Sequence, residues 1–524
     1  MARRPKTSRH SRKKSKRRTS GAEEQLLARA ISLHQRGKAN EAGALYVEIL
    51  NTDPDNPDVL HRFGVLHVDV GRTEKAIELI GEALQHQPGN AGIRCDLGNA
   101  LQSMGRHEEA IECYLAVLEA EPRNLTALTN LGLVSQILGL DREARAALTA
   151  ALEIAPTDAM LNFNFGTVLQ GQGRLDEAEA AYRRALTANP KMLAAQVNIG
   201  NVNLDREHFA EAAAAFERAI ALDPGLAIAH ANLGSALDAL ERVEEASAAT
   251  RRALEIDPDN VIALGNLGQA LQEDEQPVKA VKTFQRLLKV EPGHVNTLAH
   301  LAIALQEAGQ REEAAAIFDF KTLLAICPIS RVKGYDNVAN FNAALKHYIL
   351  NHPTLVWERP AKSTTNGSQT LELLTGDDPV AIALRQMIED NLADYISTRL
   401  MKAGSRYRGC APQNWRLTSW AVVLKSGGHQ SPHNHPMGVV SGVYYLNIPE
   451  SVGREDDGLA GCLRLGQSNL RIKGKRDQAG FLTETIAPLE GVMVLFPSYF
   501  WHHTIPFESK DYRISVAFDA IPTQ

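Results

Sequence analysis

The sequence predicts a multidomain α + β protein in which an array of helical hairpins precedes a domain of short β-strands. Three observations support this fold class. One residue pattern repeats every 34 positions, the repeat stops near Pro328, and short runs rich in Val, Ile, Tyr and Phe begin at Trp415. The length of 524 residues also exceeds that of one compact core, so two or more domains are expected.

The chain begins with a strongly basic segment. Residues 1–18 carry ten Lys and Arg and no acid, although the whole chain has a net charge of −6. The segment has no apolar core and is therefore not a secretory signal, and such a charge run predicts a disordered tail over residues 1–20. It is either a solvated tail or a contact for nucleic acid, an acidic partner or an anionic membrane surface.

Residues 21–328 contain the repeat. Proline ends each unit, small Gly and Ala let paired helices approach closely, and a large residue four positions after Ala fills the space between helices. The recurring residues are Pro54, Pro88, Pro122, Pro156, Pro190, Pro224, Pro258 and Pro292; Gly64, Gly98, Gly132, Gly166, Gly200, Gly234 and Gly268; Ala42, Ala76, Ala110, Ala144, Ala178, Ala212, Ala246, Ala280 and Ala314; and Tyr46, Tyr114, Tyr182, Phe216, Phe284 and Phe318. The pattern resembles the tetratricopeptide repeat, in about nine copies. Such repeats stack into an all-α superhelix whose concave face binds a protein or peptide.

A column of asparagines follows the same step, two positions before Gly: Asn130, Asn164, Asn198, Asn232 and Asn266. Side-chain amides both donate hydrogen bonds to a peptide backbone and accept them from it. The column therefore predicts a ladder that holds an extended chain, and it resembles the asparagine ladder of O-GlcNAc transferase. The alternative is that each amide hydrogen-bonds within its own turn.

Residues 329–411 are predicted to be a connector with supporting helices. A short helical run covers residues 339–352, a polar stretch follows, and residues 379–402 again have helical apolar spacing. These helices are expected to pack on the outside of the domain that follows.

Residues 412–524 are predicted to form a barrel or double-sheet jelly roll. Short runs rich in β-branched and aromatic residues are separated by Gly, Pro, Asn and Asp, which is typical of consecutive short strands. The runs cover residues 415–424, 439–448, 461–465, 483–488, 491–496 and 512–518.

Histidines are closely spaced in this β-strand domain. His433 and His435 are two residues apart, so on an extended strand both face one side, and His502 lies near a later strand. Three imidazoles from two strands would occupy one face of an octahedral metal site and leave positions open for a co-substrate and dioxygen. Arg513 and Ser515 also share a strand face, where a guanidinium is suited to bind a carboxylate.

The order HxH, SGVYYLN, FPSxxxHH and RISVAF resembles a bacterial group of 2-oxoglutarate, iron(II)-dependent oxygenases with the double-stranded β-helix (jelly-roll) fold. That group is also found fused to tetratricopeptide repeats, and the likeness covers about residues 412–520. The resemblance implies the following roles: His433, His435 and His502 for Fe(II); Arg513, Ser515 and Tyr445 for 2-oxoglutarate; and His429 for orienting a ligand imidazole.

The sequence therefore predicts a dioxygenase that hydroxylates a side chain of a protein or peptide presented by the repeats. His435 stands where most members of the superfamily carry Asp or Glu, and two alternatives stay open. One is a repeat scaffold with a catalytically silent barrel, and the other is a three-histidine dioxygenase that acts on a small thiol or diketone without 2-oxoglutarate. Glycosyl transfer is excluded because the strands do not alternate with helices.

The cysteines and the lengths of the apolar segments indicate the cellular compartment of the protein. Five cysteines without a C-x-x-C pair favour a reducing compartment, and no apolar stretch approaches the ~20 residues that span a membrane. We expect a cytoplasmic protein without a transmembrane segment.

Overall fold

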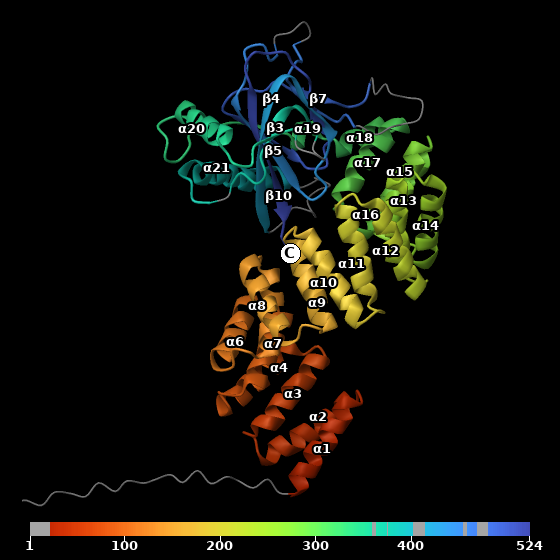
Figure 1. The fold of residues 1–524 in the computed structure, drawn as a ribbon, viewed down its shortest axis with the longest axis vertical. Coiled ribbons are helices and arrows are strands. Elements are labelled where there is room, and N and C mark those ends of the chain that lie inside the picture. Colours follow the sequence, from red (N-terminus) through yellow and green to blue (C-terminus); the bar gives the residue numbers. More distant parts are fainter. Residues whose placement is uncertain are drawn as a thin grey trace, which may run out of the picture. The chain divides into compact units, whose positions relative to one another are not determined.

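The computed structural model describes residues 21–358, 363–374, 376–401, 414–453, 458–468 and 480–523. The predicted basic tail at 1–20 and the fifth cysteine, Cys410, lie outside these ranges. The chain divides into two units, Met1–Arg206 and Glu207–Gln524, each of which is described by itself. In Figure 1 the colours follow the sequence, from red helices at the N-terminus to blue strands near the C-terminus.

The described part of the first unit consists of helices that pair in chain order. They are α1 (Gly21–Gln35), α2 (Ala39–Thr52), α3 (Pro57–Asp69), α4 (Thr73–His86), α5 (Ala91–Ser103), α6 (His107–Ala120), α7 (Leu125–Ile137), α8 (Asp141–Ile154), α9 (Ala159–Gly171), α10 (Leu175–Ala188) and α11 (Leu193–Asp205).

The second unit continues the helix pairs and then changes to mixed structure. Its helices are α12 (Phe209–Leu222), α13 (Ala227–Ala239), α14 (Val243–Ile256), α15 (Val261–Glu273), α16 (Pro277–Val290), α17 (Val295–Glu307), α18 (Arg311–Ile317), α19 (Phe320–Leu323), α20 (Val338–Leu350), α21 (Pro379–Tyr395) and a π-helical turn, η1 (Ile396–Leu400). No helix within the described ranges is both long and apolar enough to cross a lipid bilayer.

The turn inside each helix pair repeats with the 34-residue step. After the first helix of a pair, one residue adopts a positive φ, the left-handed conformation that ends a helix and is easiest for glycine. These residues are Gly37, Gly71, Gly105, Gly139, Gly173, Glu207, Glu241, Glu275 and Gly309. The backbone thus confirms the all-α repeat fold that the sequence predicts.

The predicted contact between small and large repeat residues is also present. A Cβ atom added to Gly166 would lie 2.6 Å from the ring of Tyr182, which is fully buried. Phe284 occupies the same space beside Gly268 in a later repeat. Glycine at these two positions therefore leaves the space that the large ring of the paired helix occupies.

The strands form one antiparallel sheet that curls on itself. They are β1 (Ala325–Pro328), β2 (Val356–Trp357), β3 (Thr364–Gln369), β4 (Trp415–His433), β5 (Val440–Asn447), β6 (Leu463–Leu465), β7 (Glu484–Ile486), β8 (Val492–Pro497), β9 (His502–Thr504) and β10 (Arg513–Pro522). The order along the sheet is β1-β8-β5-β10-β4-β9-β6-β7, and β3 pairs with β2 and β4. This arrangement confirms the jelly-roll class of fold.

Strand β4 is long and changes partners along its length. Its first part pairs with β10, and its last part pairs with β9 through Gln430 and His433, with a register shift between them. Gly427 has a φ of +73° near the middle of the strand. Irregularities of this kind bend a strand and redirect its side chains, so β4 delivers its last residues to a second layer of the sheet.

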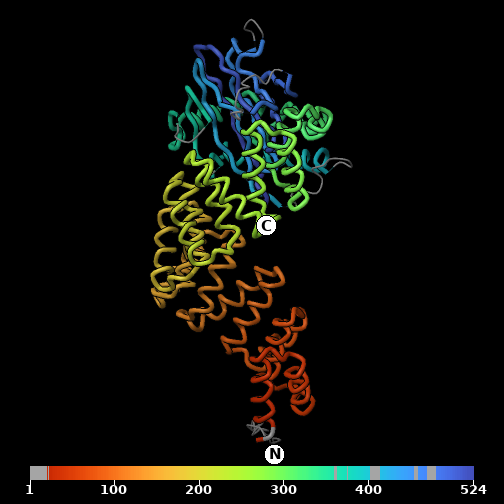
Figure 2. The backbone as a smooth tube through the Cα atoms, turned by 90° about the vertical axis from the view of Figure 1, so that its right-hand side faces the viewer, coloured from red at the N-terminus to blue at the C-terminus, as the bar shows by residue number. Residues whose placement is uncertain are grey.

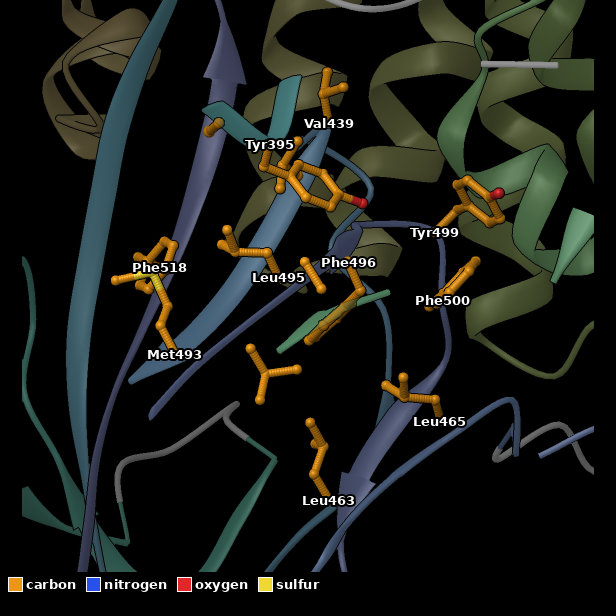
Figure 3. Close-up of a cluster of buried hydrophobic side chains, with 14 of the residues drawn as sticks. Tyr395, Val439, Leu463, Leu465, Met493, Leu495, Phe496, Tyr499, Phe500 and Phe518 are labelled. Atoms are coloured by element: carbon orange, nitrogen blue, oxygen red, sulfur yellow. The ribbon is translucent and has the colours of Figure 1, made fainter. Parts of the chain in front are cut away.

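The last repeats and the sheet share one hydrophobic core. A single cluster of buried side chains extends from Ala280 and Phe284 through α17 to the strands. Figure 2 shows the green helices of these repeats beside the blue strands, and Figure 3 shows part of the cluster, including Phe496 and Phe500. On the other side of the sheet, Asn342 of α20 accepts a hydrogen bond from Tyr444 at 2.7 Å.

The end of the repeats differs from the expected position at residue 328. Helix α18 ends at Ile317, and residues Ala325–Pro328 form β1, which pairs with β8. The 34-residue length of a repeat extends the last repeat to about this point, because pairing between segments so far apart in the chain leaves no local pattern that would end it earlier.

Candidate active site

Three histidines converge at the end of β4. His433 lies directly opposite His502 of β9 in the strand register, and His435 follows two residues later. Ring centroids are separated by 4.4 Å between His433 and His502, by 4.9 Å between His435 and His502, and by 5.1 Å between His433 and His435. One ring nitrogen from each lies within 4.8 Å of the others, close enough to share one metal ion.

Hydrogen bonds orient all three imidazoles in the same way. Nδ1 lies 2.7 Å from Ser431 O in His433, 2.7 Å from Asp519 Oδ1 in His435 and 2.9 Å from Phe500 O in His502. Carbonyl and carboxylate oxygens only accept hydrogen bonds, so each Nδ1 carries the hydrogen. The lone pair then stays on Nε2, the nitrogen left for a metal.

Burial keeps two of these imidazoles neutral at pH 7. It lowers the pKa of His433 to about 4, with a further decrease from the neighbouring His435. It also lowers the pKa of His502 well below the ordinary value. Neutral imidazole is the form that binds a metal.

Asp519 of β10 is a site residue that the sequence interpretation missed. It is buried, and besides His435 it accepts a hydrogen bond from Ser441 Oγ at 2.6 Å, while Ser441 also contacts Ser498 Oγ at 2.9 Å. Its position was detectable, because Arg513, Ser515 and Asp519 are separated by even steps and so share one strand face. An acid on the inner face of an apolar strand is a signal for a polar site.

Arg513 lies at the start of β10 and is only 1% exposed. Its Nε donates to Gly461 O at 3.1 Å, and its guanidinium carbon lies 5.2 Å from the ring centroid of Tyr445. In the described part of the chain no acid forms an ion pair with it. Burial lowers its pKa, yet a guanidinium remains charged at any physiological pH.

Tyr445 and Ser515 lie side by side across β5 and β10 and line the same pocket as Arg513. Burial raises the pKa of Tyr445 to about 12, so its hydroxyl stays protonated. The Arg513 guanidinium beside this hydroxyl lowers its pKa and opposes part of the effect of burial. Among the residues that the structure describes, no acceptor for the hydroxyl hydrogen of Tyr445 is found, so the pocket contains a donor without an acceptor.

One pocket, of about 420 Å³ including its open mouth, contains these groups and the three histidines. Its apolar lining includes Trp420, Val443, Leu463 and Phe496. A pocket with an apolar lining and a few convergent polar groups is the usual form of a small-molecule site.

Two further histidines lie near the site but outside the cluster. His429, predicted to orient a ligand imidazole, has Nδ1 3.2 Å from Gly427 O, and no hydrogen bond to the three clustered imidazoles is described. That contact is made by Asp519 instead. His503 follows His502 but lies opposite Arg464 of β6, and burial lowers its pKa to about 4.

The predicted asparagine ladder is partly engaged within the repeats. Asn130 donates to Asn99 Oδ1 at 2.7 Å, Asn198 donates to Tyr182 Oη at 3.2 Å, and Asn266 donates to Ala231 O at 3.0 Å. Asn232 is buried, and Asn164 is half-buried. Hydrogen bonds between helices therefore occupy some of the donors and acceptors of these asparagine side chains. The role of the asparagines in binding a peptide stays a prediction.

Helix α17 contacts both segments that carry the clustered histidines. Asn434, between His433 and His435, donates to Asn296 Oδ1 at 3.4 Å. His300 meets Trp501, the residue before His502, edge to face with a centroid distance of 6.0 Å. The last repeat is thus part of the framework of the site.

Comparisons with known proteins agree with this architecture. The family model described as "Putative 2OG-Fe(II) oxygenase" matches residues 418–519, and models described as "Tetratricopeptide repeat" match residues 67–131, 125–158, 163–227, 197–261 and 249–282. No curated protein gives a significant match.

Similar solved structures include MamA, with 26% identity, coverage of 32% of this chain and 92% of MamA, and a TM-score of 0.31. YrrB, described as a TPR protein with an unusual peptide-binding site, has 26% identity, coverage of 36% of this chain and 96% of YrrB, and a TM-score of 0.32. A tetratricopeptide repeat protein from Parabacteroides merdae has 17% identity, coverage of 48% and 98%, and a TM-score of 0.41. The family matches thus place tetratricopeptide repeats within residues 67–282, ahead of a C-terminal region at residues 418–519 that is similar to the family described as "Putative 2OG-Fe(II) oxygenase".

Proposed function

We propose that the C-terminal domain is an Fe(II)- and 2-oxoglutarate-dependent dioxygenase that hydroxylates a side chain of a protein or peptide held by the repeats. One observation supports this function best. A single pocket combines three converging imidazoles with a buried arginine that no acid of the described chain neutralises. The imidazoles suit a metal, and the arginine suits a carboxylate.

The donor set fits a divalent transition metal. His433, His435 and His502 would bind it through Nε2, and imidazole nitrogen is a common ligand of iron. Asp519 places a negative charge one hydrogen bond behind His435, which makes that imidazole a stronger donor. A histidine in place of a carboxylate ligand lowers the electrostatic stabilisation of the bound metal ion. The negative charge of Asp519 restores part of that stabilisation.

The other end of the pocket fits the far carboxylate of 2-oxoglutarate. Burying an unpaired charge costs free energy, so the site of Arg513 favours an anion. The guanidinium, the Tyr445 hydroxyl and the Ser515 hydroxyl can donate hydrogen bonds to its oxygens. Arg513 thereby favours 2-oxoglutarate over a diketone, which carries no carboxylate, whereas the carboxylate of a small thiol acid would fit the same guanidinium.

Iron(II) in this site, together with 2-oxoglutarate and dioxygen, supplies the oxidising power to hydroxylate a C–H bond. The residues of the chain fix the geometry and keep water away. Phe496 and Leu463 belong to the buried core and line the pocket beside His502, so they limit the access of water to the reacting groups.

A polypeptide is the proposed substrate because of the repeats. Tetratricopeptide repeats generally bind proteins or peptides along their concave face, and the predicted asparagine ladder would contribute there. Helix α17 belongs to the repeats and touches both histidine segments. A chain held by the last repeats would therefore have a short path to the pocket.

Binding of 2-oxoglutarate provides the first test. The protein is loaded with Fe(II) without oxygen and titrated with 2-oxoglutarate by calorimetry. Arg513→Gln should weaken binding by about 10- to 100-fold, the value of one or two charge-assisted hydrogen bonds. Arg464→Gln, which removes a half-buried arginine on the outer side of His503, is the matched control and should have little effect.

Turnover and metal content provide the second test. His502→Ala should lose the metal and the release of succinate, whereas His503→Ala, the adjacent residue outside the cluster, should keep the metal. Metal bound by the parent protein without any binding of 2-oxoglutarate would favour the scaffold with a silent barrel. Oxygen uptake that ignores 2-oxoglutarate would favour the three-histidine dioxygenase.

A further inference from the structure

One repeat lacks the large side chain that fills the space between paired helices. The position four residues after the repeat alanine is occupied by a large side chain, at most 2% exposed, in the other eight repeats: Tyr46, Ile80, Tyr114, Leu148, Tyr182, Phe216, Phe284 and Phe318. The repeat formed by α13 and α14 carries Thr250 there. A threonine cannot fill the volume that a tyrosine or phenylalanine fills, so an opening is expected beside Gly234.

The structure has a pocket at this place. It encloses about 1130 Å³, including its open mouth, and lies between α13, α14 and α15, which are neighbours in Figure 1. Gly234 and Thr250 both line it, and Thr250 packs directly on Gly234, since a Cβ added there would lie 2.6 Å from Thr250 Oγ1. The pocket therefore lies where the repeat carries a threonine in place of a larger side chain.

The pocket has an apolar side and a negative mouth. Val243, Leu267 and Leu271 provide apolar surface, and Asp238, Glu273 and Asp274 provide carboxylates. The lining contains no Lys, Arg or His. Helices α13 and α15 also end at the mouth, where the last carbonyl groups of a helix carry partial negative charge.

Two polar groups in the pocket have no partner within the described part of the chain. Thr250 is 5% exposed, and its hydroxyl forms no hydrogen bond there. Asp238 forms no ion pair, and its partial burial raises the pKa of its carboxyl. A carboxylate that is partly desolvated without a cation nearby favours a positively charged ligand.

We propose that this pocket binds a Lys or Arg side chain of a polypeptide partner, with the aliphatic stem against Leu267 and Leu271 and the cationic end at Asp238 and Asp274. Long basic side chains combine an apolar stem with a charged end, which matches both parts of the pocket. The inference deepens the proposed function by naming a side chain of the bound polypeptide. It rests on that function only where the partner is also the substrate.

Selection of peptides tests the proposal. A library of random dodecapeptides displayed on phage is selected on the immobilised whole chain and, in parallel, on Thr250→Tyr, which introduces the residue that three other repeats carry at this position. The parent chain should select peptides that share one Lys or Arg at a fixed distance from an apolar residue. The variant should select few of them, and the best synthetic peptide should bind it at least 10-fold more weakly by fluorescence anisotropy.

A second variant keeps the test valid if Thr250→Tyr does not fold. Asp238→Asn preserves the pocket and removes one charge, so it should weaken binding of the peptide and reduce its salt dependence. Asp205→Asn, an exposed acid at the end of α11, is the matched control and should change neither.

Three outcomes would overturn the proposal. They are selection of peptides without a shared basic residue, equal binding by the parent chain and Thr250→Tyr, and failure of the parent chain to select any peptide. Enrichment of an aromatic residue instead would assign the pocket to a different side chain. The assay measures binding without iron or 2-oxoglutarate, so its failure is distinguishable from failure of the proposed catalysis.

Discussion

Helices α15 and α17 hold the same position in successive repeats but bury very different shares of their surface. Four residues of α15 are buried, against eleven of the thirteen in α17. Helix α15 packs on its repeat neighbours and leaves one side open, whereas α17 packs on its repeat and also on the sheet. The same repeat pattern thus lines an open pocket in one place and forms a structural element of the β domain in another.

The difference follows from the side chains. Helix α17 reads VNTLAHLAIALQE, with apolar residues around the whole helix, and a helix of this kind is stable in water only when it is enclosed. The last repeat has therefore become part of the core that positions the histidines.

The largest effect is expected from truncating a core residue of α17. Leu301 is 4% exposed and belongs to the shared core, so Leu301→Ala should destabilise the β domain by about 2–5 kcal/mol. Leu267→Ala changes the same position of α15, which is half-buried at an open pocket, and should cost about 1 kcal/mol or less. All four tryptophans lie beyond residue 350, so their fluorescence during urea unfolding reports on the β domain. If Leu301→Ala and Leu267→Ala shifted the urea midpoint of this transition equally, the structural role of α17 in the β domain would be contradicted.

The next largest effect is expected on metal affinity. It compares two contacts to the histidine segment, one from Asp519 of β10 and one from Asn296 of α17. Asp519→Asn keeps the shape of the side chain and removes its charge, so metal affinity should fall about 10- to 100-fold. Asn296→Ala removes only a neutral contact of 3.4 Å to Asn434 and should change affinity about 3-fold at most. Titration with Co(II), followed by its visible absorption, measures both. A larger loss of metal affinity in Asn296→Ala than in Asp519→Asn would show that the helix contact contributes more to metal binding than the strand contact.

A pH-dependent effect is expected at the end of α17. Burial raises the pKa of Glu307 from 4.5 to about 7. The folded chain therefore holds this proton more strongly than the unfolded chain, and the resulting stability is complete below pH 4.5 and is lost as the pH rises through about 7. Glu307→Gln should raise the free energy of unfolding by about 1–2 kcal/mol at pH 8, with allowance for partial exposure, and leave it nearly unchanged near pH 4.5.

Glu273 occupies the same position at the end of α15 but is exposed. Glu273→Gln should change the free energy of unfolding by less than about 0.5 kcal/mol at either pH. Similar pH profiles for the two variants would show that the burial of Glu307 does not determine its titration.

The smallest effect is expected in the turns that follow these helices. Glu275, after α15, has a φ of +53°, and Gly309, after α17, has a φ of +77°. Left-handed backbone costs a non-glycine residue about 1 kcal/mol, so Glu275→Gly should stabilise its repeat and Gly309→Ala should destabilise its own by about that amount. Thermal unfolding followed by circular dichroism at 222 nm compares the two. Destabilisation by Glu275→Gly would show that its side chain forms contacts that outweigh the strain.

The repeats could be predicted from the sequence in some detail because their pattern is local. Pro, Gly and Ala in one register specify where helices end and how closely they approach, within a few dozen residues. The strand runs were predictable for the same reason. The short strands β1, β2, β3 and β9 were not, since edge pairing with distant residues leaves little trace in so few side chains.

The candidate site could be predicted only in part. Even spacing placed His433 and His435 on one face and Arg513 with Ser515 on another, and the structure brings all four and His502 to one pocket. Asp519 was missed although it continues the same even spacing along β10. The metal and co-substrate roles of these residues stay predictions that the titrations above test.

By itself the sequence determined the 34-residue repeat, the change to short strands and the set of histidines and arginine that the site requires. Those features depend on neighbours along the chain. Only the tertiary structure decided that Asp519 supports His435, that α17 contacts both histidine segments and that Thr250 leaves a pocket open. Each of these depends on packing between residues far apart in the chain or on a volume left unfilled, and a local pattern names the residues without specifying those contacts.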